Sequence, residues 1–250
     1  AHQDAIMLDP RLFARVQKLY DNRDSLGLDP QGVRLVERYH DDFVRAGAQL
    51  ADADKARLKQ INAELAKLGT DFNQNVLAEV NESAVVVENR KQLAGLTDAQ
   101  IDAAAAAAKS RGLDGKYVIA LVNTTIQPVI AQLDDRALRR RIYEASVARG
   151  SRGNQYDNTA IVSQVMKLRA EKANMLGYPN WAAYRLADQT AKTPEAVNDM
   201  LGKLAPPAVA NAKREAADLQ AMIDKTQKAR GEPTFKLAAW DWSYYTERVR

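Results

Sequence analysis

Residues 54–76 read DKARLKQINAELAKLGTDFNQNV. The apolar residues of this stretch follow one another in steps of three or four: Leu58, Ile61, Leu65, Leu68, Phe72 and Val76. Because an α-helix repeats every 3.6 residues, this spacing places all of them on one face. We therefore predict a long amphipathic helix that begins near Asp54 and forms the spine of the N-terminal half.

Helices with clear start signals lie on both sides of this stretch. Asp9-Pro10 and Asp29-Pro30 each combine a capping carboxylate with a proline in the first turn, and each opens a run with helical periodicity. Thr97 and Gln100 form a capping box for an alanine-rich helix at 101–111. The first half of the chain is therefore predicted to be mainly helical.

The second half continues in the same way. The spacing of apolar residues predicts helices at 135–149, 157–176, 180–187 and 193–204. Pro206-Pro207 then predicts a break, because proline lacks the backbone N–H that a helix interior uses. A separate helix is expected at 208–229.

Two short stretches favour strands. Residues 84–88 read AVVVE, and three consecutive β-branched residues are more typical of a strand than of a helix. Residues 117–122 read YVIALV and form the second candidate. The predicted fold class is all-α with a minor two-stranded β ribbon at about 84–88 and 117–122. Residues 1–250 are expected to form one helical region, with 1–133 (helices plus ribbon) and 134–250 (helical) as a finer division.

Composition and charge exclude several functional classes. The net charge is only +4 over 250 residues, which argues against a nucleic-acid partner. The densest basic spot favours a solvated helix face over a phosphate site; it comprises Arg136, Arg139, Arg140 and Arg141. No apolar run approaches the roughly 20 residues needed to cross a bilayer, so no membrane partner is predicted.

The residues that usually carry catalysis are scarce. The chain has no cysteine and only two histidines, His2 and His40. Neither belongs to a His-Glu-x-x-His motif, and His40 is interpreted as a packing or surface residue. Residues 150–154 (GSRGN) indicate a flexible connection rather than a nucleotide cradle, and Asp134-Asp135 is interpreted as a cap rather than a catalytic pair. No catalytic or metal-binding residue is predicted, and the substrate-binding residues stay unknown.

Two aromatic clusters stand out in a chain with only 6% aromatic residues, one at 178–184 and one at 240–245. Core packing is the favoured interpretation. The alternative is a groove wall, because tyrosine and tryptophan combine an apolar face with a polar atom that suits a peptide backbone.

These clusters also carry a family resemblance. LGYPNWAAY at 176–184, ADQTAKTPEA at 187–196 and WDWSYYTERVR at 240–250 resemble the thimet oligopeptidase-like zinc metallopeptidases. Within that family, ALVNTTIQP at 120–128 and AKTPEA at 191–196 are more similar to the bacterial peptidyl-dipeptidases (dipeptidyl carboxypeptidases) than to oligopeptidase A. The resemblance extends over essentially the whole chain.

The resemblance implies a multi-helix lobe of an ellipsoidal molecule with a deep substrate channel. It also implies that the whole enzyme uses zinc to remove C-terminal dipeptides from oligopeptides. The zinc motif of the family has no counterpart in this segment, so the segment is expected to be inactive by itself and to bind no zinc. The implied partners are oligopeptide substrates and the remaining C-terminal catalytic region of the same chain.

Both ends of the sequence suggest a piece of a larger protein. The chain begins with Ala1 rather than Met, and the helix that starts near Trp240 meets no stop signal before Arg250. Cytoplasm and periplasm both stay open as compartments, and cleavage specificity and oligomeric state are not determined by the sequence. The alternative is a stand-alone helical protein that serves as a binding module or scaffold.

Overall fold

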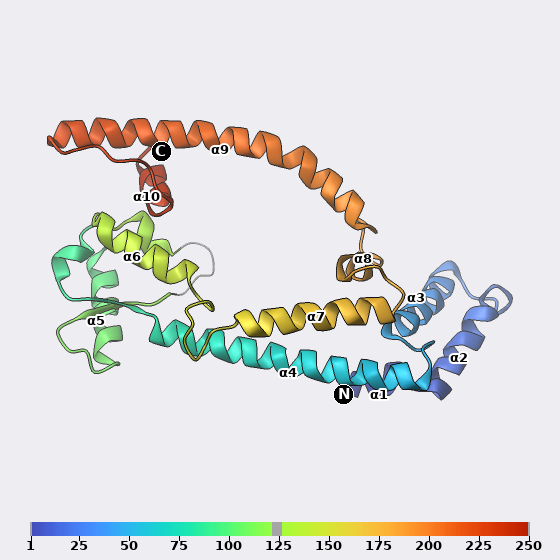
Figure 1. The fold of residues 1–250 in the computed structure, drawn as a ribbon. Helices are drawn as coiled ribbons and strands as arrows, with labels where there is room; N and C mark the ends of the chain where they lie inside the picture. The colour runs from blue at the N-terminus through green and yellow to red at the C-terminus, as the bar shows by residue number, and fades with distance from the viewer. Residues whose placement is uncertain (1, 122–126, 250) are drawn as a thin grey trace. The chain divides into compact units, whose positions relative to one another are not determined.

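The structure is a computed structural model that describes residues 2–121 and 127–249. Its α-helices, labelled in Figure 1, are α1 His2–Met7, α2 Pro10–Asp21, α3 Pro30–Ala46, α4 Asp52–Glu82, α5 Asp98–Lys109, α6 Arg136–Val147, α7 Thr159–Met175, α8 Trp181–Leu186, α9 Pro194–Arg230 and α10 Ala239–Val249. Strands β1 Val85–Val87 and β2 Tyr117–Ile119 pair with each other. The predicted all-α class with a minor ribbon is confirmed.

The helix starts follow from local side-chain chemistry. The Asp9 carboxylate accepts hydrogen bonds from the backbone N–H groups of Arg11 and Leu12 at the start of α2. Asp29 does the same for α3 through Gly32. The predicted capping box of α5 is also present, with Thr97 and Gln100 each accepting from the other's backbone N–H.

The β ribbon is antiparallel and shorter than predicted. Val85 lies opposite Ile119 and Val87 opposite Tyr117. The flanking residues Ala84, Glu88 and 120–121 are not in strands, and Val122 lies outside the described residues. Val85 and Val87 are buried while Val86 between them is half-buried, so the period-two alternation covers only this short ladder.

The predicted break at Pro206-Pro207 is wrong. Helix α9 runs continuously from Pro194 to Arg230 with both prolines inside it, and Figure 1 draws it as one curved helix. Each proline removes one backbone hydrogen bond, and the carbonyls that lose a partner belong to Gly202 and Lys203. These residues are exposed, so water can satisfy the freed carbonyls, and the helix bends instead of ending.

The chain packs into two compact units, each made of two separate stretches. Unit 1 comprises Ala1–Phe72 with Ala160–Asp199, and unit 2 comprises Asn73–Thr159 with Met200–Arg250. This grouping differs in kind from the sequential division at residue 133, which stays a prediction. Within the described residues, no helix is both long and apolar enough to cross a membrane.

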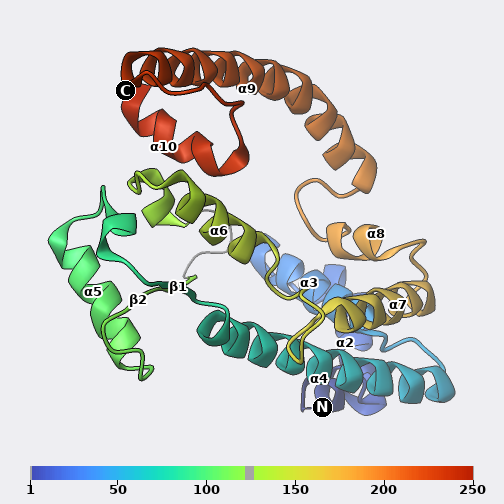
Figure 2. The same ribbon diagram turned by 60° about the vertical axis from the view of Figure 1, so that its left-hand side comes forward.

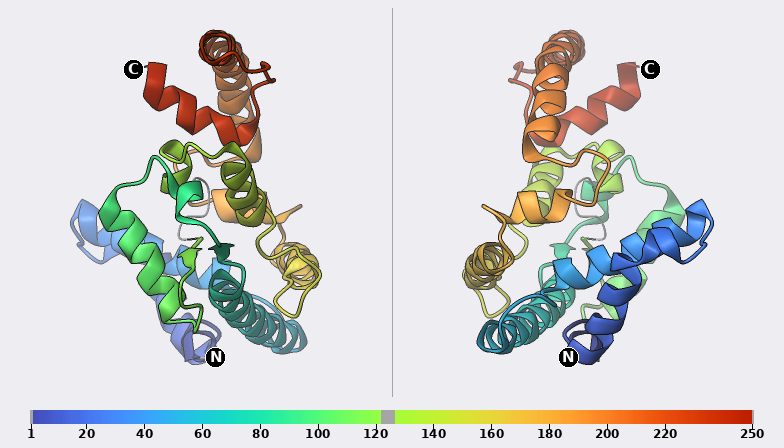
Figure 3. Two further views of the ribbon diagram at one scale, coloured as in Figure 1. Left: turned by 90° about the vertical axis from the view of Figure 1, so that its left-hand side faces the viewer. Right: turned by 90° about the vertical axis from the view of Figure 1, so that its right-hand side faces the viewer.

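In unit 1, the first part of α4 lies alongside α7 in the antiparallel direction (Figures 1 and 3). The Arg57 guanidinium forms two hydrogen bonds with the Glu171 carboxylate, at 2.7 and 2.9 Å. Further along, Gln164 donates to Glu64 at 3.0 Å. Leu58 and Ile61 are fully buried, as the periodicity of the quoted stretch predicts.

In unit 2, helix α10 lies between α9 and α6, as Figures 1 and 2 show. Leu219 and Ile223 of α9 pack against Tyr244 and Tyr245 of α10. A second core surrounds the ribbon and includes Val87, Leu93, Leu121, Leu133 and Ile142, all with no exposed surface.

The basic spot on α6 is not the solvated face that the sequence suggested. Arg139 is 1% exposed, and its Nη2 lies 2.9 Å from the Asp241 carboxylate, which is fully buried. Arg136 also contacts Asp241, with Nη2 at 2.8 Å. Only Arg140 and Arg141 are exposed, so half of the cluster serves internal ion pairing.

Candidate functional site

A polar cavity of about 600 Å³ lies in unit 1. Its walls come from α1, α3, α4, α7 and α8, together with Asp188, which lies two residues after the end of α8. The lining residues are Gln3, Asp4, Met7, Asp42, Arg45, Ala46, Asn62, Lys172, Tyr184, Arg185 and Asp188. Three cations and three carboxylates thus line one hollow.

Arg45, in the last turn of α3, holds one wall together. Its guanidinium donates to the Tyr184 carbonyl at 2.8 Å, to the Asp188 carboxylate at 3.2 Å and to the Tyr178 hydroxyl at 3.3 Å. The same group lies 5.0 Å from the Tyr184 ring centroid, which is within cation–π range. Arg45 therefore fixes α8 and Asp188 against α3.

The local sequence explains why α8 presents these groups. Gly177, with φ +80°, ends α7 in the left-handed conformation that glycine tolerates. The Asn180 side chain then caps α8 by accepting from the Ala183 N–H at 2.8 Å. The tight turn between two helices places Tyr178 and Tyr184 edge to face, with centroids 5.3 Å apart.

A second wall is a line of hydrogen bonds. The Lys172 ammonium donates to the Asn62 side-chain oxygen at 2.6 Å, and the Asn62 amide donates to the Asp4 carboxylate at 2.7 Å. Burial lowers the pKa of Lys172; Asp4 opposes this lowering and the nearby Arg185 adds to it. The cavity therefore holds a lysine whose charge is poorly solvated and close to a second cation.

Other groups of the wall keep definite charge states at neutral pH. Burial raises the pKa of Tyr184, so its hydroxyl stays protonated and donates to the Arg45 carbonyl at 3.4 Å. The Gln189 amide, followed by Arg45 and Arg38, holds the pKa of Asp188 below its usual range. The wall thus offers fixed donors and a fixed anion.

This arrangement is suited to binding a charged ligand. Paired cations and carboxylates around a polar hollow suit a ligand that carries both charges, such as a peptide with its two ends or charged side chains. Within residues 2–121 and 127–249, no three His, Cys, Asp or Glu side chains are placed to hold a metal ion.

His40, Asp134 and Asp135 all have structural roles in the folded chain. His40 is buried, stacks on Tyr20 at 3.8 Å between centroids and contacts Gln17 at 3.0 Å, as expected of a packing histidine. Asp135 caps α6 through the Leu138 N–H at 2.9 Å, which confirms the capping interpretation, while Asp134 accepts from the Tyr244 hydroxyl at 2.7 Å.

The loop at 150–154 is more firmly held than a flexible connection. The fully buried Glu79 carboxylate accepts from the Gly150 N–H and from Arg152 Nε, the latter at 2.7 Å. Gly150 and Gly153 both have positive φ, so the chain turns there without a side-chain penalty.

The aromatic cluster at 178–184 is partly a packing cluster and partly a cavity wall, the two alternatives that the sequence offered. Tyr178, Trp181 and Tyr184 pack together and are half-buried, and Tyr184 also lines the cavity. The cavity as a whole has no sequence signature, because its residues come from separate elements. Only the exceptional density of aromatic residues pointed to this region.

Comparison with known proteins identifies the class to which the chain is related. Residues 129–250 match Peptidase family M3. The predicted relationship to this group of peptidases is therefore confirmed.

The individual relatives are more specific. The chain is 44% identical over 245 residues to dipeptidyl carboxypeptidase of Escherichia coli (strain K12), covering 98% of this chain and 35% of that protein. It is 42% identical to the dipeptidyl carboxypeptidase of Salmonella typhimurium, with the same coverage. A probable cytosolic oligopeptidase A of Arabidopsis thaliana is 33% identical, covering 96% of this chain and 34% of that protein. The chain thus spans about a third of the length of these curated relatives, and its likeness to dipeptidyl carboxypeptidase exceeds that to this oligopeptidase A.

Proposed function

We propose that this chain is the non-catalytic helical part of a zinc metallopeptidase that removes C-terminal dipeptides from oligopeptides. The observation that carries the proposal is the 44% identity to dipeptidyl carboxypeptidase across 98% of the chain. The sequence contains no His-Glu-x-x-His motif, so we assign the chemistry to a remaining C-terminal catalytic region.

The residues present do not fit a zinc site. His40 is committed to Tyr20 and Gln17, and His2 is exposed on α1. A zinc site of the usual kind needs three or four close nitrogen, sulfur or carboxylate ligands, and the described residues contain no such group. In our proposal, zinc is therefore a cofactor of the whole enzyme and is not bound by this segment.

We assign the polar cavity of unit 1 to contact with the oligopeptide. Arg185 lines it, is exposed, and forms no hydrogen bond or ion pair among the described residues. A peptide carboxylate can pair with it, with the half-buried Lys172 as its neighbour.

Activity measurements test the proposal. The purified 250-residue chain, supplied with zinc, should not cleave a blocked tripeptide or tetrapeptide. The complete gene product should release a C-terminal dipeptide from the same substrate and lose this activity when zinc is chelated. Cleavage by the 250-residue chain, or a natural reading frame that ends at Arg250, would contradict the proposal and favour a stand-alone binding protein.

The role of the cavity has its own test. In the complete gene product, Arg185→Met should raise KM for an oligopeptide about tenfold with little change in kcat, because one charge-assisted hydrogen bond is worth about that factor. Arg15→Met is the matched control, since Arg15 is exposed on α2 in the same unit and does not line the cavity. An equal effect of both substitutions on KM would remove the cavity from the peptide-binding surface.

A further inference from the structure

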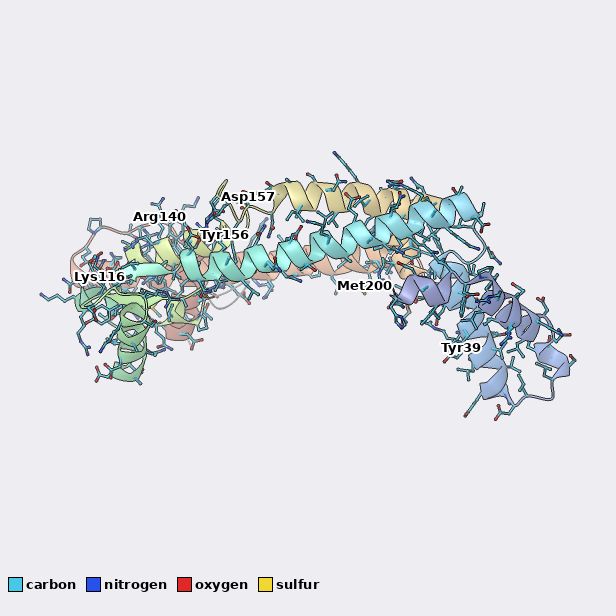
Figure 4. The ribbon with its side chains drawn as sticks, turned by 90° about the horizontal axis from the view of Figure 1, so that it is seen from below. Tyr39, Lys116, Arg140, Tyr156, Asp157 and Met200 are labelled. Carbon is cyan, nitrogen blue, oxygen red and sulfur yellow. The ribbon has the colours of Figure 1, made fainter. Side chains whose placement is uncertain are left out.

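Part of helix α9 is exposed to solvent on all sides. Every residue from 200 to 215 is exposed. This stretch belongs to unit 2 and begins at Met200, which is labelled in Figure 4. Its large apolar side chains are between 51% and 56% exposed: Met200, Leu201, Leu204 and Val209.

The exposed apolar side chains are concentrated on one face. Leu201, Leu204, Ala208 and Ala212 follow one another in steps of three or four and therefore share a side of the helix. Continuing in the same steps, this face reaches Ala216, Leu219 and Ile223. Leu219 and Ile223 are buried against α10. One continuous face is thus covered at its C-terminal end and open over 200–215.

The composition of the open part makes it a poor helix by itself. It contains Gly202, Pro206 and Pro207, and proline is by far the least favourable residue in a helix interior. Helices in proteins are stabilised mainly by burying an apolar face, and this stretch buries none. The continuity of α9 here is best explained if another surface covers the face.

We propose that the open face of α9, residues 200–215, docks against the part of the peptidase that lies outside the segment matched here. About 65% of the length of dipeptidyl carboxypeptidase lies outside the match, since the match covers 35% of it. The face also continues the established packing of α9 on α10. The choice of partner rests on the proposed function, whereas the existence of a covered face does not.

The test compares two alanines of the same stretch. Ala208 lies on the apolar face and Ala210, two residues further on, lies on the opposite side; both are exposed. Ala208→Asp and Ala210→Asp therefore carry the same change in charge, size and helix propensity. Hydrogen–deuterium exchange over 200–215 is measured in the complete gene product, in both variants of it and in the 250-residue chain.

The proposal expects amide exchange over 200–215 to be at least about tenfold slower in the complete gene product than in the 250-residue chain. Ala208→Asp should remove this protection and Ala210→Asp should keep it. If Ala208→Asp prevents folding of the complete protein, the milder Leu204→Ala should show a partial loss of this protection.

Equal exchange in the complete product and the 250-residue chain would overturn the proposal. Protection of the 250-residue chain that grows with its concentration would also overturn it, because the partner would then be a second copy. Peptidase activity is scored separately. An active product with unprotected residues 200–215 rejects only the docking, and a protected but inactive product rejects only the proposed function.

Discussion

Asp241 shows how strongly a single side chain can matter. It is fully buried, and it accepts hydrogen bonds from Arg136 and Arg139 as well as from the Ala238 N–H at 3.1 Å. The Arg139 guanidinium also lies 3.9 Å from the Tyr244 ring centroid. One carboxylate thus pairs with two cations and joins α6 to α10.

We predict that Asp241→Asn lowers the free energy of unfolding by about 3–5 kcal/mol, because it leaves the buried Arg139 without a counter-charge. Urea unfolding followed by circular dichroism measures this loss. Asp134→Asn is the control, since the Asp134 side chain is 52% exposed and its pairing with Arg248 should be worth less than about 1 kcal/mol. Equal losses in the two variants would mean that Asp241 is not a buried ionic centre.

The burial of Lys172 should make the stability of the fold depend on pH. Burial lowers its pKa in the folded protein from the ordinary 10.5, so the unfolded chain holds this proton more tightly than the folded one. Between the lowered pKa and about 10.5, stability therefore rises with pH, and below that window the full cost of burying the charge is present. We expect Lys172→Met to be more stable than the parent at neutral pH, with the difference shrinking as pH approaches 10.5. Urea midpoints across this range measure it, and a constant difference would show that Lys172 is not desolvated.

Among the secondary-structure elements, those whose determinants are close in sequence were predictable. The caps at Asp9, Asp29 and Thr97 use partners two or three residues away, and they are found as expected. The environment of Arg139 was not predictable, because its partner Asp241 is 102 residues away. The cavity was missed for the same reason, since its walls combine α1, α3, α4, α7 and α8.

Helix α9 is the helix whose prediction from local sequence was wrong. A proline pair normally ends a helix, but the effect of Pro206 and Pro207 depends on whether other contacts hold the helix together. Such contacts involve residues far away in the sequence, so the residues around Pro206 and Pro207 do not reveal them. Helix α9 bends without a break although residues 200–215 are all exposed, so neither the local pattern nor packing among the described residues accounts for its continuity.

The structure predicts that replacing both prolines with alanine stabilises α9. Pro206→Ala with Pro207→Ala restores two backbone hydrogen bonds and should raise the free energy of unfolding by about 3 kcal/mol or more. Pro194→Ala is the control, because Pro194 is the first residue of α9, where proline costs little. If the double variant gains neither stability nor helical circular dichroism, the helix is broken at this point as the sequence suggested.

The molecule as a whole is built from interleaved stretches. Each compact unit combines two stretches that are separated along the chain by a stretch of the other unit. The core around the ribbon combines Leu93 and Leu133 with Leu138 and Ile142. A cut after residue 133 therefore passes through this core.

We predict that neither 1–133 nor 134–250 folds cooperatively when produced alone, because both compact units and the core around the ribbon combine residues from the two sides of this cut. Urea titration of each half should give a broad, non-cooperative change, and mixing the halves should restore part of the transition. A sharp transition in one isolated half would instead support the sequential division into 1–133 and 134–250.

The ion pair between Arg139 and Asp241 also has a consequence during protein synthesis. Ribosomes add about 5–20 residues per second, so the 102 residues between the two partners correspond to a delay of about 5–20 s. During that interval α6 has been made, but the carboxylate that neutralises Arg139 has not. The nascent chain thus carries an unsatisfied cation and an uncovered apolar surface until α10 emerges, and chaperones that bind such surfaces have this interval in which to act.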